Sequence, residues 1–344
     1  MIKCSLDFNK FIEISKNYFK KFFKILPNVV VPLIIMIFIQ TYFGVQNSTI
    51  GIVLIFICMF KVNQIANLQS YLKMSFLLII IAILASIASI NIYTSIVFNL
   101  IIPFLIIFST TANQKESNYF IYGHEYIMLQ SYPIGISQIP ERVFAVMVAL
   151  FLGYIFMKIY NRKTKFDDNL VCDGDLVWHN LKNFKNELNF KTPRIRFAVR
   201  TSFILWITCV FMDSIQDRNA RSYWLPLTTY SCLEIDNQKQ KSKLLSQIGG
   251  TTLGIAIFTI IFHWIPTNAL IVFMGLAFTI LFTVNNQYLK KAIGTILGMS
   301  FVIPSLGEQG AIFLRFTYVL LAISVIAIVE YLRVVVRKIE KQFE

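Results

Sequence analysis

Residues 194–254 of the chain read RIRFAVRTSFILWITCVFMDSIQDRNARSYWLPLTTYSCLEIDNQKQKSKLLSQIGGTTLG. A basic start leads into an apolar run over 201–212, and a short element rich in rings and hydroxyls follows at 222–231. A charged hinge at 236–243 then precedes a glycine- and threonine-rich helix start at 249–254. The rest of the chain is typical of membrane helices packed around this stretch and around a degenerate copy of it.

The composition predicts an all-α integral membrane protein with the lipid bilayer as a partner. Of the 344 residues, 56% are hydrophobic and 15% are charged, against roughly a quarter charged in soluble proteins. The formal net charge is +14, but the basic residues lie in short runs between apolar segments. That distribution is typical of cytoplasmic loops and not of a face that binds nucleic acid, so no nucleic-acid partner is expected.

Twelve apolar segments fall into two sets of six. They are 27–45, 49–60, 71–90, 92–110, 118–136 and 142–160, then 197–215, 222–235, 247–265, 267–284, 288–305 and 311–332. A shift of 173 positions lays the first set close to the second, with Arg142 on Arg315 and 49–60 on 222–235. The sequence therefore predicts two parallel six-helix repeats, about twelve transmembrane segments with some short or broken. A helix as short as 49–60 cannot cross a core of about 30 Å alone.

Charge placement predicts the topology. Residues 7–25 form a basic amphipathic helix expected at the interface, and the Lys and Arg clusters place both termini in the cytoplasm of a multi-pass protein of the cell membrane. The expected regions are an interfacial helix at 1–26, a first repeat at 27–160, a cytoplasmic linker with a short amphipathic helix at 161–193, a second repeat at 194–333 and a cytoplasmic tail at 334–344.

The sequence holds no motif of an enzyme, a cofactor or a metal site. It has no P-loop, and its five cysteines and three histidines have no metal-ligand spacing. We therefore expect no cofactor and no metal, and any pumping must draw on an ion gradient or a partner. The nearest approach to a catalytic pair is His124 beside Glu125, which leaves a membrane enzyme acting on a lipid-linked acid as a further alternative.

The element at 222–235 predicts a binding site. Tyr223 and Trp224 offer flat apolar surface, and Thr228 and Thr229 offer hydroxyls, a mixture that suits a ligand with a ring and a polar end. A short helix interrupted by Pro226 also indicates a site near the membrane midplane. The alternative is an interfacial aromatic belt with hydroxyls bonded to their own helix.

Charged residues flank this element. Arg196 and Arg200 lie at the inner end of the seventh segment, Asp213 near its outer end, and Glu234 and Lys243 beside the hinge. Ionisable groups at membrane depth pair or line a water path, although the arginines could instead extend to the interface. From position alone, Asp213 or Glu234 is expected to carry a coupling proton.

A small-residue motif follows the hinge. Gly250, Thr251 and Gly254 recur in spacing at 294–298. Small residues four apart predict close helix packing, and the alternative is a helix start that binds an anion.

These residues resemble the bacterial fusaric acid resistance protein-like family, which includes the aromatic acid exporters. Residues 196–200 match the basic R-x-x-x-R of its pattern, 223–228 match YW-x-P-L-T, and 248–254 match the glycine-threonine part. Gln247 stands where the pattern of this family usually has arginine. The stretch is also similar to the plant aluminium-activated malate channels, at Trp224, Thr228, Glu234, Lys243, Gly250 and Thr251.

The resemblance implies a membrane transporter that exports aromatic or other organic acids. Small organic anions are then the expected substrates, and a homo-oligomer is left open. The alternative is a passive organic-anion channel, as the plant proteins imply. The expected substrate-binding residues are Arg196, Arg200, Tyr223, Trp224, Thr228, Thr229, Glu234 and Lys243.

Overall fold

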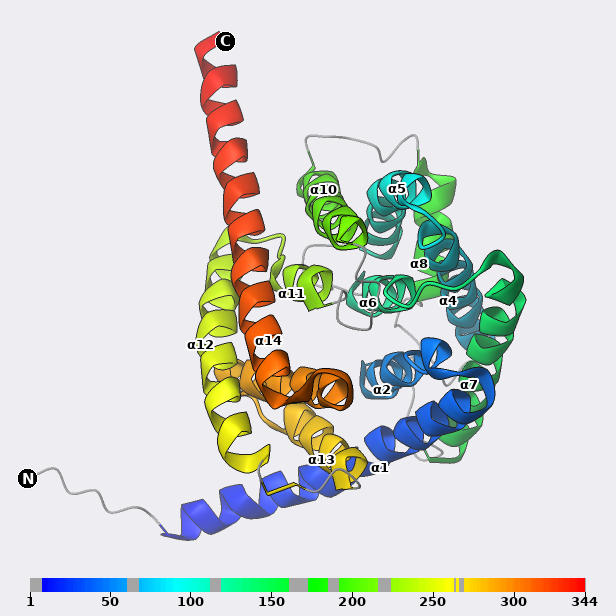
Figure 1. Cartoon of the computed structure of the whole chain (residues 1–344), viewed down its shortest axis with the longest axis vertical. Helices are drawn as coiled ribbons and strands as arrows, with labels where there is room; N and C mark the ends of the chain where they lie inside the picture. The colour runs from blue at the N-terminus through cyan, green and yellow to red at the C-terminus, as the bar shows by residue number, and fades with distance from the viewer. Residues whose placement is uncertain are drawn as a thin grey trace, which may run out of the picture.

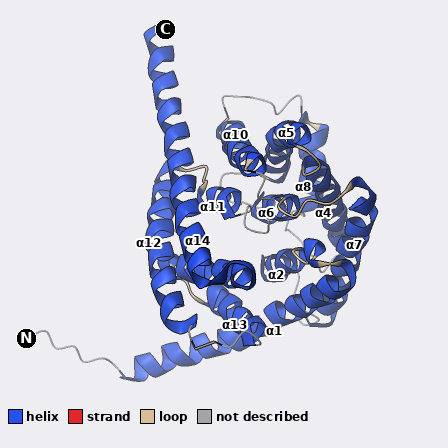
Figure 2. Cartoon of the chain, in the orientation of Figure 1, coloured by secondary structure: helices blue, strands red, loops and turns tan. Residues whose placement is uncertain are grey.

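The computed structural model describes residues 8–60, 68–111, 119–160, 173–184, 192–215, 224–262, 264–265 and 269–343. Within these ranges the elements are helices, with no strand among them (Figure 2). The prediction of an all-α chain is confirmed. Tyr223 and parts of the predicted linker, at 161–172 and 185–191, lie outside the described residues.

Each predicted segment corresponds to helix. The first half contains α1 (Phe8–Phe43), η1 (Val45–Asn47), α2 (Ile50–Phe60), α4 (Leu68–Ala88), α5 (Ile92–Thr110), α6 (Tyr119–Gln130), η2 (Ile136–Gln138), α7 (Ile139–Tyr160) and α8 (Asp173–Lys182). The second half contains α10 (Pro193–Ser214), α11 (Trp224–Cys232), α12 (Asn237–Phe262), α13 (Leu270–Thr283) and α14 (Gln287–Phe343).

Several boundaries differ from the predicted ones for local reasons. The expected interfacial helix at 7–25 and the first span form one helix, α1. The fifth segment ends at Gln130 and not at 136, because Pro133 disfavours helical geometry at the residue before it. The eleventh and twelfth segments lie in α14, which kinks at Gly307, where φ is 71°. A positive φ of this size is a conformation that glycine adopts without strain.

Seven helices in the described part are long and apolar enough to cross a membrane. They are Ser15–Phe43, Leu68–Ala88, Ile92–Thr110, Ile136–Tyr160, Pro193–Ser214, Gln238–Phe262 and Gly307–Val335. The chain is therefore a multi-pass membrane protein. The helices α2, α6 and α11 have 11, 12 and 9 residues, so each is too short to cross a core of about 30 Å. The arrangement of two six-helix repeats is thus not confirmed and stays a prediction.

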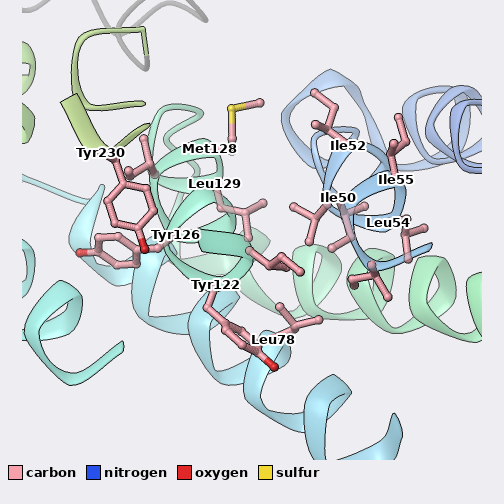
Figure 3. Close-up of a cluster of buried hydrophobic side chains, with 14 of the residues drawn as sticks. Ile50, Ile52, Leu54, Ile55, Leu78, Tyr122, Tyr126, Met128, Leu129 and Tyr230 are labelled. Atoms are coloured by element: carbon pink, nitrogen blue, oxygen red, sulfur yellow. The ribbon is translucent and has the colours of Figure 1, made fainter. Parts of the chain in front are cut away.

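The three short helices lie in the interior of the bundle (Figure 1). In that view α12 and α14 flank them on one side and α4, α5 and α7 on the other. Helix α11 packs against α14, α10, α6 and α12, and α6 packs against α4, α2 and α5. Figure 3 shows the core that results, where α2, α6 and Tyr230 of α11 bring their buried side chains together. Helix α11 therefore joins the two halves of the chain.

Arg142 of α7 is buried in the first half and has an extensive set of protein partners. Its guanidinium donates to the Asn47 side-chain oxygen at 3.0 Å and to the Ser86 hydroxyl at 3.2 Å. It also donates to the carbonyl oxygens of Leu129 at 2.9 Å, Gln46 at 3.3 Å and Tyr132 at 2.5 Å. With five acceptors supplied by protein, this cation fixes the turns that connect α1 to α2 and α6 to α7.

Candidate functional site

Hydroxyls on two faces of α11 donate to carbonyl oxygens of the same helix, that of Ser231 to Thr228 at 2.9 Å and that of Thr229 to Leu225. Trp224, Thr228 and Ser231 follow one another at i, i+4 and i+7 and so share a face. Thr229 lies off that face, is fully buried, and donates its hydroxyl to the Leu225 carbonyl at 2.8 Å. For Thr229 the structure therefore places the hydroxyl on its own helix, as the alternative interpretation of this element expected.

The opposite side of α11 packs on α6. The Tyr230 hydroxyl donates to the Tyr119 carbonyl at 2.6 Å, and its ring stacks on Phe120 at 6.0 Å. A Cβ added at Gly123 would collide with the Tyr230 ring. Glycine at this position therefore lets the two short helices approach closely.

A cavity of about 220 Å³ opens beside the start of α10. We call it the basic vestibule, and its lining includes three arginines, Arg196, Arg200 and Arg333. Arg196 is exposed, whereas Arg200 is 9% exposed. The rest of the lining comes from apolar Pro193, Phe197 and Ile235 and from the exposed carboxylate of Asp236. The vestibule therefore combines three guanidinium groups with one carboxylate and apolar surface at the end of α11.

Arg200 connects three elements at the base of the vestibule. Its guanidinium forms an ion pair with Glu330 of α14 at 2.7 Å and donates to the Glu234 carbonyl. Glu330 also pairs with Arg333 at 3.1 Å. Glu330 and Arg333 were not among the predicted site residues, although their i, i+3 spacing on an amphipathic helix end is visible in the sequence.

Glu234 and Lys243 form an ion pair across the hinge between α11 and α12, with 2.6 Å between Nζ and Oε1. The Lys243 side chain is 30% exposed and that of Glu234 is 20% exposed. The two predicted residues are therefore brought together, in contact with each other.

Asp213 lies at the other end of α10 from Arg200. The two are about 20 Å apart along the helix, from a rise of about 1.5 Å per residue. Asp213 is half-buried and accepts from the Ser95 hydroxyl and from the Gln130 amide at 3.4 Å. The predicted proton carriers, Asp213 and Glu234, are thus well separated.

A buried polar chain leads away from Asp213. The Tyr126 hydroxyl donates to the Asn99 side-chain oxygen at 2.8 Å, and the Asn99 amide donates to the Ser95 hydroxyl at 2.8 Å. Ser95 in turn donates to the Asp213 carboxylate. The carboxylate is therefore connected by side-chain hydrogen bonds to the centre of α6.

The glycine-threonine motif lies in the contact between α12 and α14. A Cβ at Gly254 would lie 2.5 Å from the Ala292 carbonyl oxygen, and the Thr251 hydroxyl lies 3.4 Å from that of Thr295. Gln247 donates to Thr251 at 3.2 Å. The expected helix start at 249–254 is wrong, because α12 begins at Asn237. The N–H groups of the motif are consequently inside a helix, which removes the basis for an anion site there.

Two cations of α14 that were not among the predicted site residues face α11. The Arg315 guanidinium lies 5.5 Å from the centre of the Trp224 ring and donates to the Thr228 hydroxyl at 3.3 Å. Lys291 donates to the Ser231 hydroxyl at 3.2 Å. No spacing rule within the sequence connects residues 60 or more positions apart, so the structure was needed to find these contacts with α11.

His124 and Glu125 are buried in α6, at 5% and 0% exposed. Within the described residues, neither ring nitrogen of His124 and neither oxygen of Glu125 has a hydrogen-bond partner. The His124 ring instead contacts Phe56 at 4.9 Å. No group of three His, Cys, Asp or Glu side chains that could hold a metal ion occurs among the described residues.

Comparison with known proteins gives one family. Residues 204–329 match the family model described as fusaric acid resistance protein-like. This range runs from within α10 to the last residue before Glu330. No curated protein matches the chain, and no solved structure does.

Proposed function

Because the chain belongs, through residues 204–329, to the fusaric acid resistance protein-like family, we propose that it exports aromatic or other organic acids across the cell membrane. The family region contains α11 and the seam that this helix forms with α14. The sequence has no nucleotide-binding P-loop. In this proposal an ion gradient drives export, and energy supplied through a partner protein is the alternative.

The basic vestibule is the observation that carries the proposal. Arginine binds carboxylates through paired, charge-assisted hydrogen bonds, and Arg196 and Arg333 bring this chemistry to one cavity. Its volume of about 220 Å³ is below the range of about 300–1,000 Å³ that is usual for drug-sized ligands. A small acid with one ring or a short chain therefore suits it better than a large amphiphile.

The charge distribution orients the protein in this proposal. Arg196 and Arg333 line the vestibule, and Lys239 and Lys241 lie in the first turns of α12. Positive charge favours the cytoplasmic side. The vestibule then collects its substrate from the cytoplasm, and both termini lie there. The proposal keeps the two-repeat topology. Two buried arginines support it, Arg142 and Arg315, because they stand 173 positions apart in the sequence, the shift between the two predicted repeats.

Asp213 is the proposed coupling group. Its oxygen accepts from neutral donors, Ser95 and Gln130, so a change in protonation would alter these hydrogen bonds directly. Glu234, whose carboxylate pairs with Lys243, is the second candidate. We expect Asp213→Asn to leave substrate binding in place and to abolish accumulation against a gradient.

The test is growth in a panel of aromatic and aliphatic acids, with and without the gene, together with efflux of labelled benzoate from loaded cells. Arg196→Gln should slow efflux, because Arg196 lines the vestibule and is exposed. Lys239→Gln, an exposed change on the same end, is the matched control. Equal growth with and without the gene on every acid would refute the proposal. Benzoate currents that need no ion gradient would instead assign the protein as a channel.

A further inference from the structure

Helix α8 packs against two membrane spans, α4 and α5 (Figure 1). The Asn180 side-chain amide donates to the carbonyl oxygen of Ser109 at 2.7 Å, which fixes α8 to the last turn of α5. The Trp178 ring stacks on the Phe76 ring of α4, with 6.5 Å between the ring centres. Helix α8 therefore bridges the two spans at the end where α4 begins and α5 ends.

A cavity of about 150 Å³ lies between these three helices, and we call it the α4–α5 groove. Its lining is apolar along both spans, with Ile80 and Leu105 as examples, and includes Lys73 and Ser109. The Ser109 hydroxyl donates to the Ile106 carbonyl at 3.2 Å, so the protein itself satisfies that group. A ligand in the groove therefore meets apolar side chains along its length and an ammonium group at one end.

The groove is as deep as one leaflet of a bilayer. Its lining on α4 runs from Lys73 to Leu84, which is about 16 Å at a rise of about 1.5 Å per residue. Both α4 and α5 are long and apolar enough to cross a membrane, and half of a hydrocarbon core of about 30 Å is about 15 Å. The groove therefore extends from the interface to about the midplane, which is the depth that one acyl chain of a lipid occupies.

Interfacial and basic residues lie at the shallow end of the groove. Trp178 is 52% exposed, and tryptophan is enriched where a membrane meets water. Lys73 lines the groove, the exposed Lys182 is in the last turn of α8, and Asp173 and Asp175 are in the first turn of that helix. Among the described residues that line the groove, none is acidic. Basic pockets between membrane helices bind anionic lipid headgroups, so this end suits an amphiphile with a negative head.

We propose that the α4–α5 groove binds an anionic phospholipid of the cytoplasmic leaflet. One acyl chain lies between α4 and α5 beside α8, and Lys73 attracts the phosphate of the headgroup. The leaflet follows from the positive charge at this end of the spans. A bound lipid would hold α8, which lies between the two halves of the chain, at the membrane surface. The proposal does not depend on the proposed transport function.

Equilibrium binding of tritiated dioleoylphosphatidylglycerol and dioleoylphosphatidylcholine to the purified, full-length protein in detergent tests the site. The wild type should bind the phosphatidylglycerol, which is anionic, more tightly. Lys73→Gln should weaken that binding by about fivefold, the effect of one basic residue near a membrane surface, and leave the binding of phosphatidylcholine unchanged. The matched control is Lys158→Gln, the same loss of charge at an exposed position in the last turn of α7. This control should bind both lipids as the wild type does.

A second pair of variants tests the acyl chain. Ile80→Trp places a large ring in the groove and should weaken the binding of both lipids by about tenfold, a loss within the range that overpacking of a filled site produces. Leu72→Trp adds the same ring to α4 at a position that is 57% exposed and outside the lining of the groove. That variant should bind as the wild type does.

Three results would overturn the proposal. The first is equal binding of the two lipids by the wild type, and the second is phosphatidylglycerol binding that neither Lys73→Gln nor Ile80→Trp weakens. The third is binding of labelled oleate without binding of either phospholipid, which would make a free fatty acid the occupant. Should Ile80→Trp not fold, the comparison of Lys73→Gln with Lys158→Gln decides the result.

Discussion

Two glycines of a repeated motif, the last of its first copy and the first of its second, should respond in opposite ways to alanine. In Gly254→Ala the new Cβ would lie 2.5 Å from the Ala292 carbonyl oxygen and 2.9 Å from the Thr295 Cβ. Ordinary contacts are about 3.5–4.0 Å, so α12 and α14 must separate by about 1 Å. Overpacking of this kind costs about 1–3 kcal/mol, and the obstructing atoms include backbone, which cannot rotate away.

The helix propensity of alanine offsets part of that cost, by about 1 kcal/mol. We therefore expect Gly254→Ala to lower the free energy of unfolding by about 1–2 kcal/mol. In Gly294→Ala nothing lies within 4 Å of the new Cβ, so the propensity term of about 1 kcal/mol remains and stability should rise. Unfolding of the detergent-solubilised protein by heat or denaturant measures both. Shifts of the same sign in the two variants would refute the packing of α12 on α14.

Three further predictions concern buried and exposed charges. Arg142→Gln should lower the free energy of unfolding by about 3–5 kcal/mol, because a buried cation with five hydrogen-bond acceptors is lost. Near-normal yield and stability of this variant would show that these hydrogen bonds contribute little. Glu125→Met should raise stability by about 1–3 kcal/mol, because a buried carboxyl group without a partner among the described residues is replaced by an apolar side chain; a loss of stability measured in the same way would mean that the carboxyl is bonded. Lys243→Gln should change stability by less than about 1 kcal/mol, as partly exposed ion pairs contribute little, and a larger loss would mean that the hinge depends on this pair.

Hydropathy was sufficient to locate the helices. A run such as 92–110 is apolar enough to specify its helix, and α5 has these bounds. The boundary of α6 was missed because the effect of Pro133 on the preceding residue competes with hydropathy. The predicted helix start at 249–254 was wrong because the glycines were interpreted as a helix terminus, whereas α12 runs through them and uses them for close packing.

The pairing of charges could be predicted in part. Glu234 and Lys243 lie close in the sequence and form an ion pair. Arg200 was expected to pair or line a water path, and it does pair, but its partner Glu330 lies 130 positions away. The contacts of Arg315 and Lys291 with α11 depend on how α14 packs. Local sequence patterns do not contain that information.

Counterflow of labelled benzoate into reconstituted vesicles tests the central claim most directly, namely that the protein carries organic acids that enter at the basic vestibule. Vesicles preloaded with unlabelled benzoate and containing wild-type protein or Lys239→Gln should take up the label rapidly, whereas those containing Arg196→Gln should be slow. Wild-type uptake no faster than that of protein-free vesicles, for benzoate and for the other acids of the panel, would contradict the account.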